Sequence, residues 1–439
     1  MPLRLTVLGT GYLGTTHAAC MAELGYEVLG MDVDDAKVQL LSRGEVPFFE
    51  PGLPEVLKRN IDAGRLRFTT SYEEVAAFGD VHFVCVGTPQ QPGSHAADMK
   101  YVDSVVEGLT PHLTRPCLVV GKSTVPVGTA EAMADYVAAH APVGAEAEVA
   151  WNPEFLREGH AVEDTLAPDR LVVGVRSPHA EERLREVYAP LLDQGVPLVV
   201  TDFATAQLVK VSANAFLATK ISFINAMAEL CEATGADVTQ LSAALALDPR
   251  IGGQFLKAGL GFGGGCLPKD IRAFMARAGE LGVNQALTFL REVDEINMRR
   301  RGRLVELTKA ALDGSVLGKR VAVLGAAFKP ESDDVRDSPA LNVAAGLQLQ
   351  GADVRVYDPQ ANANAARIFP SLNYVDTTEA ALDSADAVLV LTEWSQFVAM
   401  DPVAVGEIVR NRLVVDGRLC LDRERWRDAG WTYVAPGRP

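Results

Sequence analysis

A single cysteine lies inside a glycine-rich stretch near the middle of the chain, followed closely by a lysine and a carboxylate. Residues 261–270 read GFGGGCLPKD, so that Lys269 and Asp270 follow Cys266 within four residues. Glycines let a substrate and the backbone approach a thiol closely, and a neighbouring cation lowers the pKa of a cysteine. A loop with a chance cysteine is the simpler interpretation of an isolated thiol, so the rest of the chain has to decide.

A second polar pair lies upstream in an otherwise apolar stretch. Lys210 and Asn214 are four residues apart in a segment without proline, which predicts one face of a long helix that starts near Thr201. A lysine on such a helix is usually a surface residue with a buried stem. An asparagine on the same face indicates a polar ligand, and the pair is suited to stabilise an alkoxide or oxyanion.

The N-terminal residues carry a nucleotide-binding pattern. The strand at 3–8 leads into GTGYLG (9–14), a helix, and a second strand that ends at Asp32, 18 residues after Gly14. In this order Gly9 allows the tight turn, Gly11 lets the backbone approach a pyrophosphate, and Gly14 lets the helix pack closely. Asp32 would bind a ribose hydroxyl and repel a phosphate there, which favours NAD over NADP. A structural turn without cofactor is the alternative.

Bound NAD and a thiol together predict a particular chemistry. Oxidation of an alcohol needs only a base and a hydride acceptor, whereas a thiol is useful when an aldehyde must be oxidised further. Thiolate addition gives a thiohemiacetal that can lose hydride, and water can hydrolyse the resulting thioester. Asp270 and Glu154 are candidate bases for that water. The residues therefore predict a four-electron oxidation of an alcohol to an acid.

Length and composition set the limits of this interpretation. The 439 residues suggest two or three globular domains. A formal net charge of −16 argues against a nucleic-acid or anionic-membrane partner. No apolar run approaches the ~20 residues of a membrane span. Six scattered cysteines and seven histidines show no paired spacing, so we expect no disulfide framework and no metal site, and a reduced, cytoplasmic protein.

Two sets of apolar strands alternate with helical stretches. The first continues at 81–89, 116–129, 147–155 and 170–175, and the second occupies 319–329, 352–359, 385–394 and 412–418. We predict an α/β protein with two Rossmann-like, doubly wound parallel-sheet domains joined by a long helical central segment. The predicted domains are 1–200, 201–313 and 314–439, and the helical segment is the expected dimer surface.

The first turn of the second set lacks the glycine pattern. Lys329, Asp333, Asp334 and Arg336 crowd it instead. This mixture is typical of a nucleotide phosphate held by side chains, and equally of a solvated charged turn; both interpretations stay open.

Nine motifs, in order, resemble the UDP-glucose/GDP-mannose dehydrogenase family over nearly the whole chain. They are GTGYLG (9–14), EPGL (50–53), VGTP (86–89), STVPVGT (123–129), NPEFLREG (152–159), LVKVSAN (208–214), RIGGQFLKAGLGFGGGCLPKD (250–270), GAAFKPESDDVRDSP (325–339) and DGR (416–418). The resemblance implies an NAD-dependent, four-electron oxidation of UDP-glucose to UDP-glucuronate through a cysteine thiohemiacetal and thioester. It also implies a homodimer.

The resemblance implies a role for each matching residue. The catalytic residues are Cys266 as nucleophile, Lys210 and Asn214 at the oxyanion, Asp270, Thr124 and Glu154 around the water. The NAD site comprises Gly9, Gly11, Tyr12, Leu13, Gly14, Asp32, Lys37, Thr88, Thr124, Glu158, Lys269 and Arg336. The substrate site comprises Glu154, Phe155, Leu156, Glu158, Lys210, Asn214, Arg250, Phe255, Leu256, Lys257, Gly263, Phe328, Lys329 and Arg418, with Arg250 reaching across the dimer.

Two departures and several alternatives accompany the resemblance. The family usually has a serine where this chain has Gly265, and 90–102 is atypical and expected to be a mobile loop over the cofactor. A two-electron hydroxyacid dehydrogenase would leave Cys266 and the second α/β domain without a task, and a non-catalytic NAD-binding scaffold would not require Cys266, Lys210 and Asp270 together. GDP-mannose or another nucleotide sugar is the alternative substrate within the family. Members that oxidise UDP-N-acetylmannosamine normally carry a histidine before the cysteine.

Overall fold

The computed structural model describes residues 3–438, which form two compact units. The first comprises the described residues of 3–213 and 272–282, and the second comprises those of 214–271 and 283–438. The division crosses two helices, α10 (Phe203–Thr234) and α12 (Leu267–Glu280), so the central helical segment contributes to both units. The boundaries expected from sequence, after residues 200 and 313, stay a prediction.

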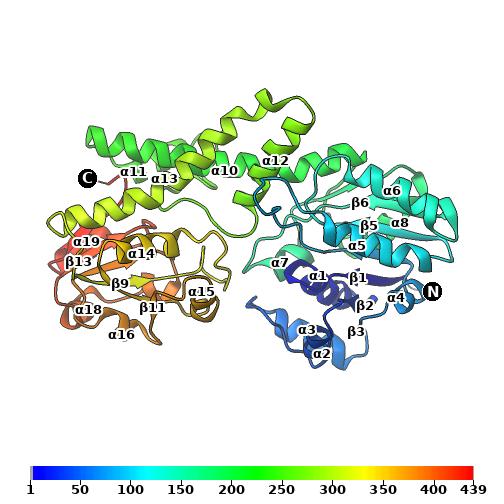
Figure 1. The fold of residues 1–439 in the computed structure, drawn as a ribbon, viewed down its shortest axis with the longest axis horizontal. Helices are drawn as coiled ribbons and strands as arrows, with labels where there is room; N and C mark the ends of the chain where they lie inside the picture. Colours follow the sequence, from blue (N-terminus) through cyan, green and yellow to red (C-terminus); the bar gives the residue numbers. More distant parts are fainter. Residues whose placement is uncertain (1–2, 439) are drawn as a thin grey trace. The chain divides into compact units, whose positions relative to one another are not determined.

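The first unit contains an eight-stranded sheet in the order β3-β2-β1-β4-β5-β6-β7-β8 (Figure 1). Its strands are β1 Arg4–Leu8, β2 Glu27–Met31, β3 Leu66–Thr69, β4 Val81–Val84, β5 Cys117–Gly121, β6 Ala147–Trp151, β7 Leu171–Gly174 and β8 Leu198–Thr201. Strands β1 to β6 are parallel, as predicted. The single pairing of β6 with β7, Trp151 opposite Gly174, is antiparallel, so the last two strands run against the others.

Helices cover both faces of this sheet. They are α1 Tyr12–Glu23, α2 Asp35–Ser42, α3 Leu53–Asp62, α4 Tyr72–Phe78, α5 Lys100–Leu109, α6 Thr129–His140, α7 Ala161–Leu166, α8 Pro178–Val187 and α9 Ala189–Leu192. One apolar core joins the sheet to α1, α3, α8 and α9. The other joins its opposite face to α4, α5, α6 and the start of α10. The predicted doubly wound arrangement is therefore confirmed for this unit.

The second unit contains a six-stranded sheet in the order β11-β10-β9-β12-β13-β14, parallel throughout. Its strands are β9 Arg320–Leu324, β10 Asp353–Tyr357, β11 Asn373–Tyr374, β12 Ala387–Val390, β13 Leu413–Asp416 and β14 Thr432–Val434. Its remaining helices are α11 Val238–Ala246, α13 Thr288–Ala311, α14 Pro339–Leu349, α15 Asn362–Ile368, α16 Thr378–Leu382, α17 Ser395–Val398, α18 Pro402–Ile408 and α19 Arg423–Asp428. Figure 1 shows this sheet in yellow to red.

The long helix α10 forms where the sequence predicts it. No proline or glycine interrupts Phe203–Thr234. At its start the Asp202 carboxylate accepts hydrogen bonds from the Thr205 backbone N–H and hydroxyl, both at 2.8 Å. It ends before Gly235, whose φ of 76° suits the left-handed conformation that terminates helices. Lys210 and Asn214 consequently lie one turn apart on a rigid element.

Candidate active site

The glycines after β1 shape the turn that leads into α1. Gly9 has a φ of 89°, and a side chain there would meet Val86. A Cβ on Gly14 would collide with the carbonyl oxygen of Gly9, so the helix can pack this closely only with glycine. Gly11 is different, because a Cβ there would meet nothing within 4 Å. The open backbone at Gly11, with the start of α1 and its residues Tyr12 and Leu13, fits a pyrophosphate at a helix N-terminus.

Asp32 directly follows β2, beside this turn. Its carboxylate accepts hydrogen bonds from the Thr10 backbone N–H at 2.9 Å and hydroxyl at 3.0 Å, and pairs with Lys37 Nζ at 2.9 Å. Burial alone would raise the pKa of Asp32, but hydrogen bonds from Lys37 and from the N–H groups of Asp34 and Thr10 lower it below its usual value. Asp32 is therefore a carboxylate suited to a ribose hydroxyl. Lys37, which the resemblance places in the NAD site, is its ion-pair partner.

Glu50 organises the loop that carries Glu158, a role that the sequence analysis did not assign. Its buried carboxylate accepts hydrogen bonds from Gly159 N–H at 2.6 Å, from Ala161 N–H at 2.7 Å and from the Tyr12 hydroxyl. Burial and the hydrogen bond with Glu50 raise the pKa of Tyr12. The sequence indicates this role only through the EPGL motif (50–53), in which Glu50 closely precedes the start of α3.

The ends of β4 and β5 are tied together. The Thr88 hydroxyl donates to the Thr124 carbonyl at 2.7 Å, and the Ser123 hydroxyl donates to the Val86 carbonyl at 2.6 Å. The predicted cofactor-contacting residues Thr88 and Thr124 thus lie on adjacent strand ends of the first unit.

Glu154 and Lys210 form a shielded ion pair in the same unit. Lys210 Nζ lies 2.9 Å from Glu154 Oε1, and the side chains are 6% and 14% exposed. The other oxygen of Glu154 accepts a hydrogen bond from the Leu156 N–H at 2.6 Å, and Lys210 lies 5.7 Å from the centre of the Phe155 ring. An ammonium and a carboxylate held together in a partly dry site can exchange a proton with a ligand or stabilise its negative oxygen.

The second unit holds the thiol and its neighbouring acid. Cys266 is exposed and directly precedes α12, whose first turn contains Asp270. The buried Asp270 carboxylate accepts a hydrogen bond from Asn214 Nδ2 and pairs with Lys269 Nζ, each at 2.6 Å. A cysteine at a helix N-terminus near a lysine has the surroundings that favour a thiolate.

Three buried polar side chains frame the chain that leads to Cys266. Asn297 accepts a hydrogen bond from Phe262 N–H at 2.7 Å and donates to its carbonyl at 2.9 Å. Asn225 accepts from Gly259 N–H at 2.9 Å, and Arg300 Nε donates to the Gly259 carbonyl at 3.3 Å. The mobile backbone expected of a glycine run is therefore held at two points, a constraint with no local sequence signal.

The glycines beside Cys266 are closely packed, two of them against groups that cannot easily move. A Cβ on Gly263 would lie 2.5 Å from the Asp337 carbonyl oxygen, and one on Gly264 would lie 2.8 Å from the Phe328 ring. A Cβ on Gly265 would meet the guanidinium of Arg336. Gly265, which stands where the family usually has a serine, therefore leaves room for the Arg336 side chain beside the nucleophile loop.

The predicted substrate residues of the second unit differ from one another in burial and in bonding partners. Arg418 is mostly buried and donates to the carbonyls of Leu391, Gly261 and Phe328, so it holds three segments together. Phe255 has a φ of 63°, an uncommon backbone conformation for an aromatic residue. Leu256 is buried between the exposed Phe255 and Lys257. Arg250 is 87% exposed and pairs with Asp248, and Lys329 lies 5.7 Å from the Phe328 ring.

The predicted site residues thus gather in two groups, one in each unit. The first unit holds the glycine turn, Asp32, Lys37, Thr88, Thr124, Glu154, Phe155, Leu156, Glu158 and Lys210. The second holds Asn214, Arg250, Phe255, Leu256, Lys257, Gly263, Cys266, Lys269, Asp270, Phe328, Lys329, Arg336 and Arg418. Helix α10 runs from the first group to the second, carrying Lys210 and Asn214 on successive turns.

Metal clusters and membrane-spanning helices are both absent from residues 3–438. These residues contain no group of three or more His, Cys, Asp or Glu side chains placed to hold a metal ion. No helix among them combines the length and apolar composition needed to cross a lipid bilayer.

Known proteins match this chain over its length. The NAD binding domain of the UDP-glucose/GDP-mannose dehydrogenase family matches residues 3–192, its central domain matches 204–299, and its UDP binding domain matches 322–423. A UDP-glucose 6-dehydrogenase of Pseudomonas aeruginosa is 41% identical over 447 residues, covering 100% of this chain and 98% of that protein. One of Rhizobium meliloti is 39% identical and covers 100% of both.

Solved structures are similar as well. A UDP-glucose dehydrogenase of Pyrobaculum islandicum has a TM-score of 0.89 at 39% identity, covering 98% of each chain. A UDP-D-ManNAc dehydrogenase of Pyrococcus horikoshii has a TM-score of 0.86 at 26% identity, covering 99% of each chain. The fold, the glycine turn and these matches define an NAD-dependent dehydrogenase. The chain belongs to the UDP-glucose/GDP-mannose dehydrogenase family.

Proposed function

We propose that the protein oxidises UDP-glucose to UDP-glucuronate, using water and two molecules of NAD for each sugar. The observation that carries the proposal is the exposed Cys266 at the start of α12, with the buried Asp270 in the next turn bonded to Asn214. An enzyme that stopped at the aldehyde would have no use for this thiol. The full-length match to UDP-glucose 6-dehydrogenases supports the same reaction.

The residues of the first unit fit the cofactor. Gly11 leaves backbone space for a pyrophosphate, and Asp32 is ionised and suited to a ribose hydroxyl. NAD, when bound, supplies the hydride acceptor for both oxidations. In our proposal Thr88, Thr124 and Glu158 line the cofactor from the first unit, and Lys269 and Arg336 do so from the second.

The first oxidation converts the primary alcohol of the sugar to an aldehyde. The hydroxyl proton leaves to a base or to water, and the carbon loses a hydride. Lys210 and Asn214 stabilise the negative oxygen that develops, since each offers an N–H donor in a partly buried environment. Glu154 holds Lys210 in place and, with Thr124, positions water.

The second oxidation requires the thiol. The Cys266 sulfur forms a bond to the aldehyde carbon, and the carbonyl oxygen becomes a hydroxyl or alkoxide of a thiohemiacetal. Loss of hydride from that carbon gives a thioester. Water then attacks the thioester, the carbon–sulfur bond breaks, and the acid leaves while Cys266 recovers its thiol. Asp270 assists the water step as base.

The substrate assignment rests on the segment before the nucleophile loop. The stretch from Arg250 to Lys257 is similar to that of the UDP-glucose enzymes, and Lys257 offers a point charge to a diphosphate. A closed pyrimidine site would leave polar edges of a purine unpaired, which is costly. GDP-mannose is the alternative substrate.

A panel of nucleotide sugars with NAD tests this proposal. We expect kcat/KM for UDP-glucose to exceed that for GDP-mannose by at least about a hundredfold, with acid as product. Comparable or reversed values would contradict the substrate assignment.

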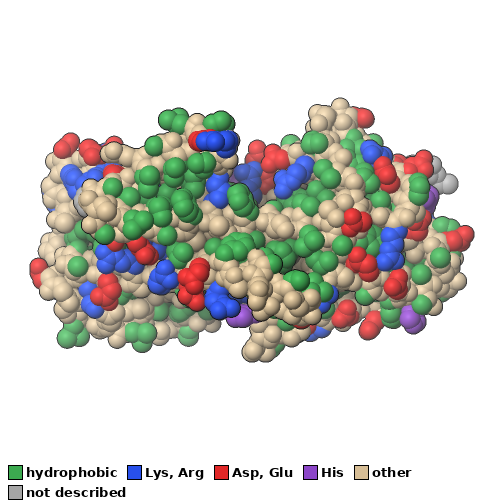
Figure 2. Space-filling view, turned by 90° about the horizontal axis from the view of Figure 1, so that it is seen from above, with side chains coloured by type: hydrophobic (Ala, Val, Ile, Leu, Met, Phe, Trp, Pro, Cys, Tyr) green, Lys and Arg blue, Asp and Glu red, His purple; other side chains and the backbone are tan. Residues whose placement is uncertain are grey.

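We also propose that the enzyme is a homodimer formed through α10. Phe216, Phe223 and Leu230 follow each other at seven-residue intervals and are 66%, 47% and 56% exposed. Figure 2, which looks onto the side where the central helices lie, shows hydrophobic side chains gathered with few charges among them. Such a stripe is typical of helix pairing.

Light scattering tests the dimer. Wild type should have twice the monomer mass, and Phe223→Glu should shift it toward the monomer. Leu349→Glu, a matched change at a residue that is 87% exposed on α14, should leave the mass unchanged. A monomeric wild type would contradict the proposal.

A free catalytic thiol also favours a reducing compartment, so we infer a cytoplasmic location.

A further inference from the structure

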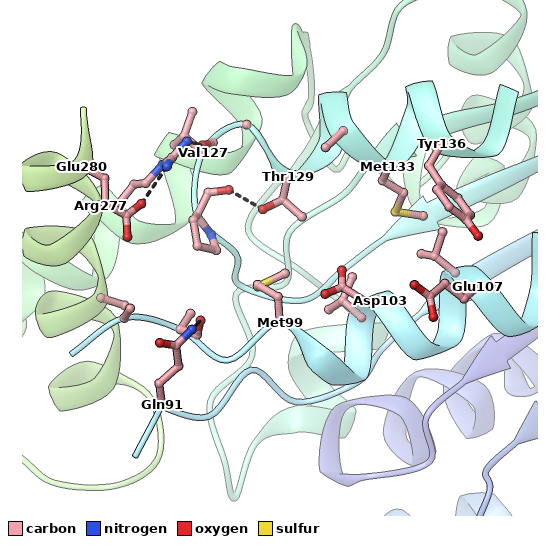
Figure 3. Close-up of a pocket in the computed structure, with 18 residues that line it drawn as sticks. Gln91, Met99, Asp103, Glu107, Val127, Thr129, Met133, Tyr136, Arg277 and Glu280 are labelled. Carbon is pink, nitrogen blue, oxygen red and sulfur yellow. Dashed lines mark hydrogen bonds and ion pairs between the residues drawn. The ribbon is translucent and has the colours of Figure 1, made fainter. Parts of the chain in front are cut away.

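A pocket of about 480 Å³ opens in the first unit, and no residue of the glycine turn at 9–14 lines it (Figure 3). Helices α5 and α6, the turn at 126–129, the segment 91–99 and the last turns of α12 form its walls. In the segment expected to be a mobile loop, Gln90 pairs with Ala97 as an isolated bridge, and α5 begins at Lys100. No role in the proposed reaction uses this space.

The floor of the pocket is apolar. Val102 and Val106 of α5 and Met133 of α6 are buried and line the pocket together with the half-buried Met99. Figure 3 shows the two methionine side chains. Methionine side chains adapt to irregular ligands and contact aromatic rings favourably. A volume of this size and an apolar lining are typical of sites for small molecules.

The rim of the pocket is acidic. Asp103 and Glu107 line it one turn apart on α5, and neither makes an ion pair within residues 3–438. Burial, then the neighbouring Glu107 and Asp98, raise the pKa of Asp103. Two like charges at this spacing repel each other, and a cation between them would relieve the repulsion.

The one cationic group of the lining is already neutralised. Arg277 donates two hydrogen bonds to the Val127 carbonyl, at 3.0 and 2.7 Å, and pairs with Glu280 at 2.7 Å. Figure 3 shows this pair on the side of the pocket opposite Asp103 and Glu107. An anionic ligand would therefore meet carboxylates without an available partner, which disfavours it.

We propose that this pocket is a second ligand site, which binds a small organic cation with an apolar body. The apolar body of the ligand packs on Met99, Val102, Val106 and Met133. Its ammonium group lies between Asp103 and Glu107. The site adjoins the turn that follows Thr124, so its ligand contacts a segment next to the cofactor residues without occupying their positions.

Titration calorimetry with three matched probes tests the proposal, in the presence and absence of NAD. Phenylbutylamine carries the charge, phenylbutanol is neutral, and phenylbutyrate is anionic. We expect the amine to bind about tenfold more tightly than the alcohol, and the acid to bind least. Saturating NAD should not compete, because the two sites are separate.

Variants locate the binding. Asp103→Asn with Glu107→Gln should weaken the amine about tenfold and leave the alcohol unchanged. Glu182→Gln with Asp193→Asn removes two exposed carboxylates elsewhere in the same unit and should change neither. Ala132→Phe, which fills the pocket from α6, should abolish binding of both. Hydrogen exchange should slow at 99–107 and 126–136 when the amine is added.

Three results would overturn the proposal. They are an acid that binds as tightly as the amine, an amine affinity unaffected by the Asp103 and Glu107 changes, and no saturable binding up to ~10 mM.

Discussion

The strands β1 and β9 begin their units in the same way, and the turns after them diverge. Gly9 N–H donates to the Met31 carbonyl and Gly325 N–H donates to the Tyr357 carbonyl, both at 2.8 Å, so each turn is anchored to the neighbouring strand. Each neighbouring strand then leads to an aspartate, Asp32 or Asp358. The chain therefore uses one strand–turn–strand scaffold twice.

The two aspartates have different tasks. Asp358 is 2% exposed and accepts hydrogen bonds from Ala326 N–H, Ala327 N–H and the Trp394 indole, at 2.7, 3.0 and 3.1 Å. Asp32 is 8% exposed and bonds only one backbone N–H of its turn. The first turn leaves the backbone at Gly11 open to a ligand, whereas two amide groups of the second turn are already bonded to Asp358.

The largest expected effect separates the two aspartates. Asp358→Ala leaves the buried N–H groups of Ala326, Ala327 and Ala361 without their acceptor and should lower the free energy of unfolding by about 4 kcal/mol. Asp32→Ala should cost about 1 kcal/mol and weaken NAD binding at least about tenfold. Denaturant unfolding and NAD titration measure both. Equal losses of stability would show that the two turns are not specialised.

Buried charged side chains also differ in how completely their polar atoms are bonded. Asp358 and Asp416 of the second unit each accept several hydrogen bonds, whereas Lys122 of the first donates to Asn152 at 2.8 Å and has no ion pair among residues 3–438. Burial lowers the pKa of Lys122 to about 8. The unfolded chain, with a lysine pKa of about 10.4, binds more protons between these values, so this residue's contribution to stability rises with pH there.

Comparison with Lys122→Met isolates this contribution. Between pH 7.5 and about 10.5 we expect wild type to gain about 2 to 3 kcal/mol relative to the variant, since ionisations elsewhere cancel. Chemical unfolding at several pH values measures the difference. A difference that does not change with pH would mean that Lys122 keeps an ordinary pKa in the folded protein.

The smallest of these effects concerns the glycines. Gly325 has a φ of 106° and a Cβ there would meet Thr392, so Gly325→Ala should cost about 2 kcal/mol. Gly11→Ala has space for its methyl group and should fold with nearly unchanged stability, while NAD binding weakens. Thermal unfolding with and without NAD distinguishes the two. If Gly11→Ala bound NAD normally, the pyrophosphate would not approach the backbone at Gly11.

The strands that the sequence did not predict are the four edges of the two sheets. They are β3, β8, β11 and β14. Central strands are covered on both faces and therefore appear as apolar runs, whereas the edge strand β8 is exposed or half-buried throughout. Continuous runs of hydrophobic residues consequently identified only the central strands, such as β1, β2 and β9.

The site could be predicted where a residue type carries its own chemistry or a local turn requires glycine. Cys266, Asp32 and Gly14 are of this kind. Glu50, Asn225, Asn297 and Arg300 are not, because they act on backbone groups 34 or more residues away in the chain. Only the tertiary structure brings such partners together.

The count of NADH per sugar tests the central proposal most directly. Wild type should form two NADH and one acid for each UDP-glucose, without free aldehyde, because the intermediate stays bound through Cys266. Cys266→Ser should form acid at least about a thousandfold more slowly while NAD affinity is unchanged. One NADH per sugar with aldehyde released by the wild type would contradict the thioester route.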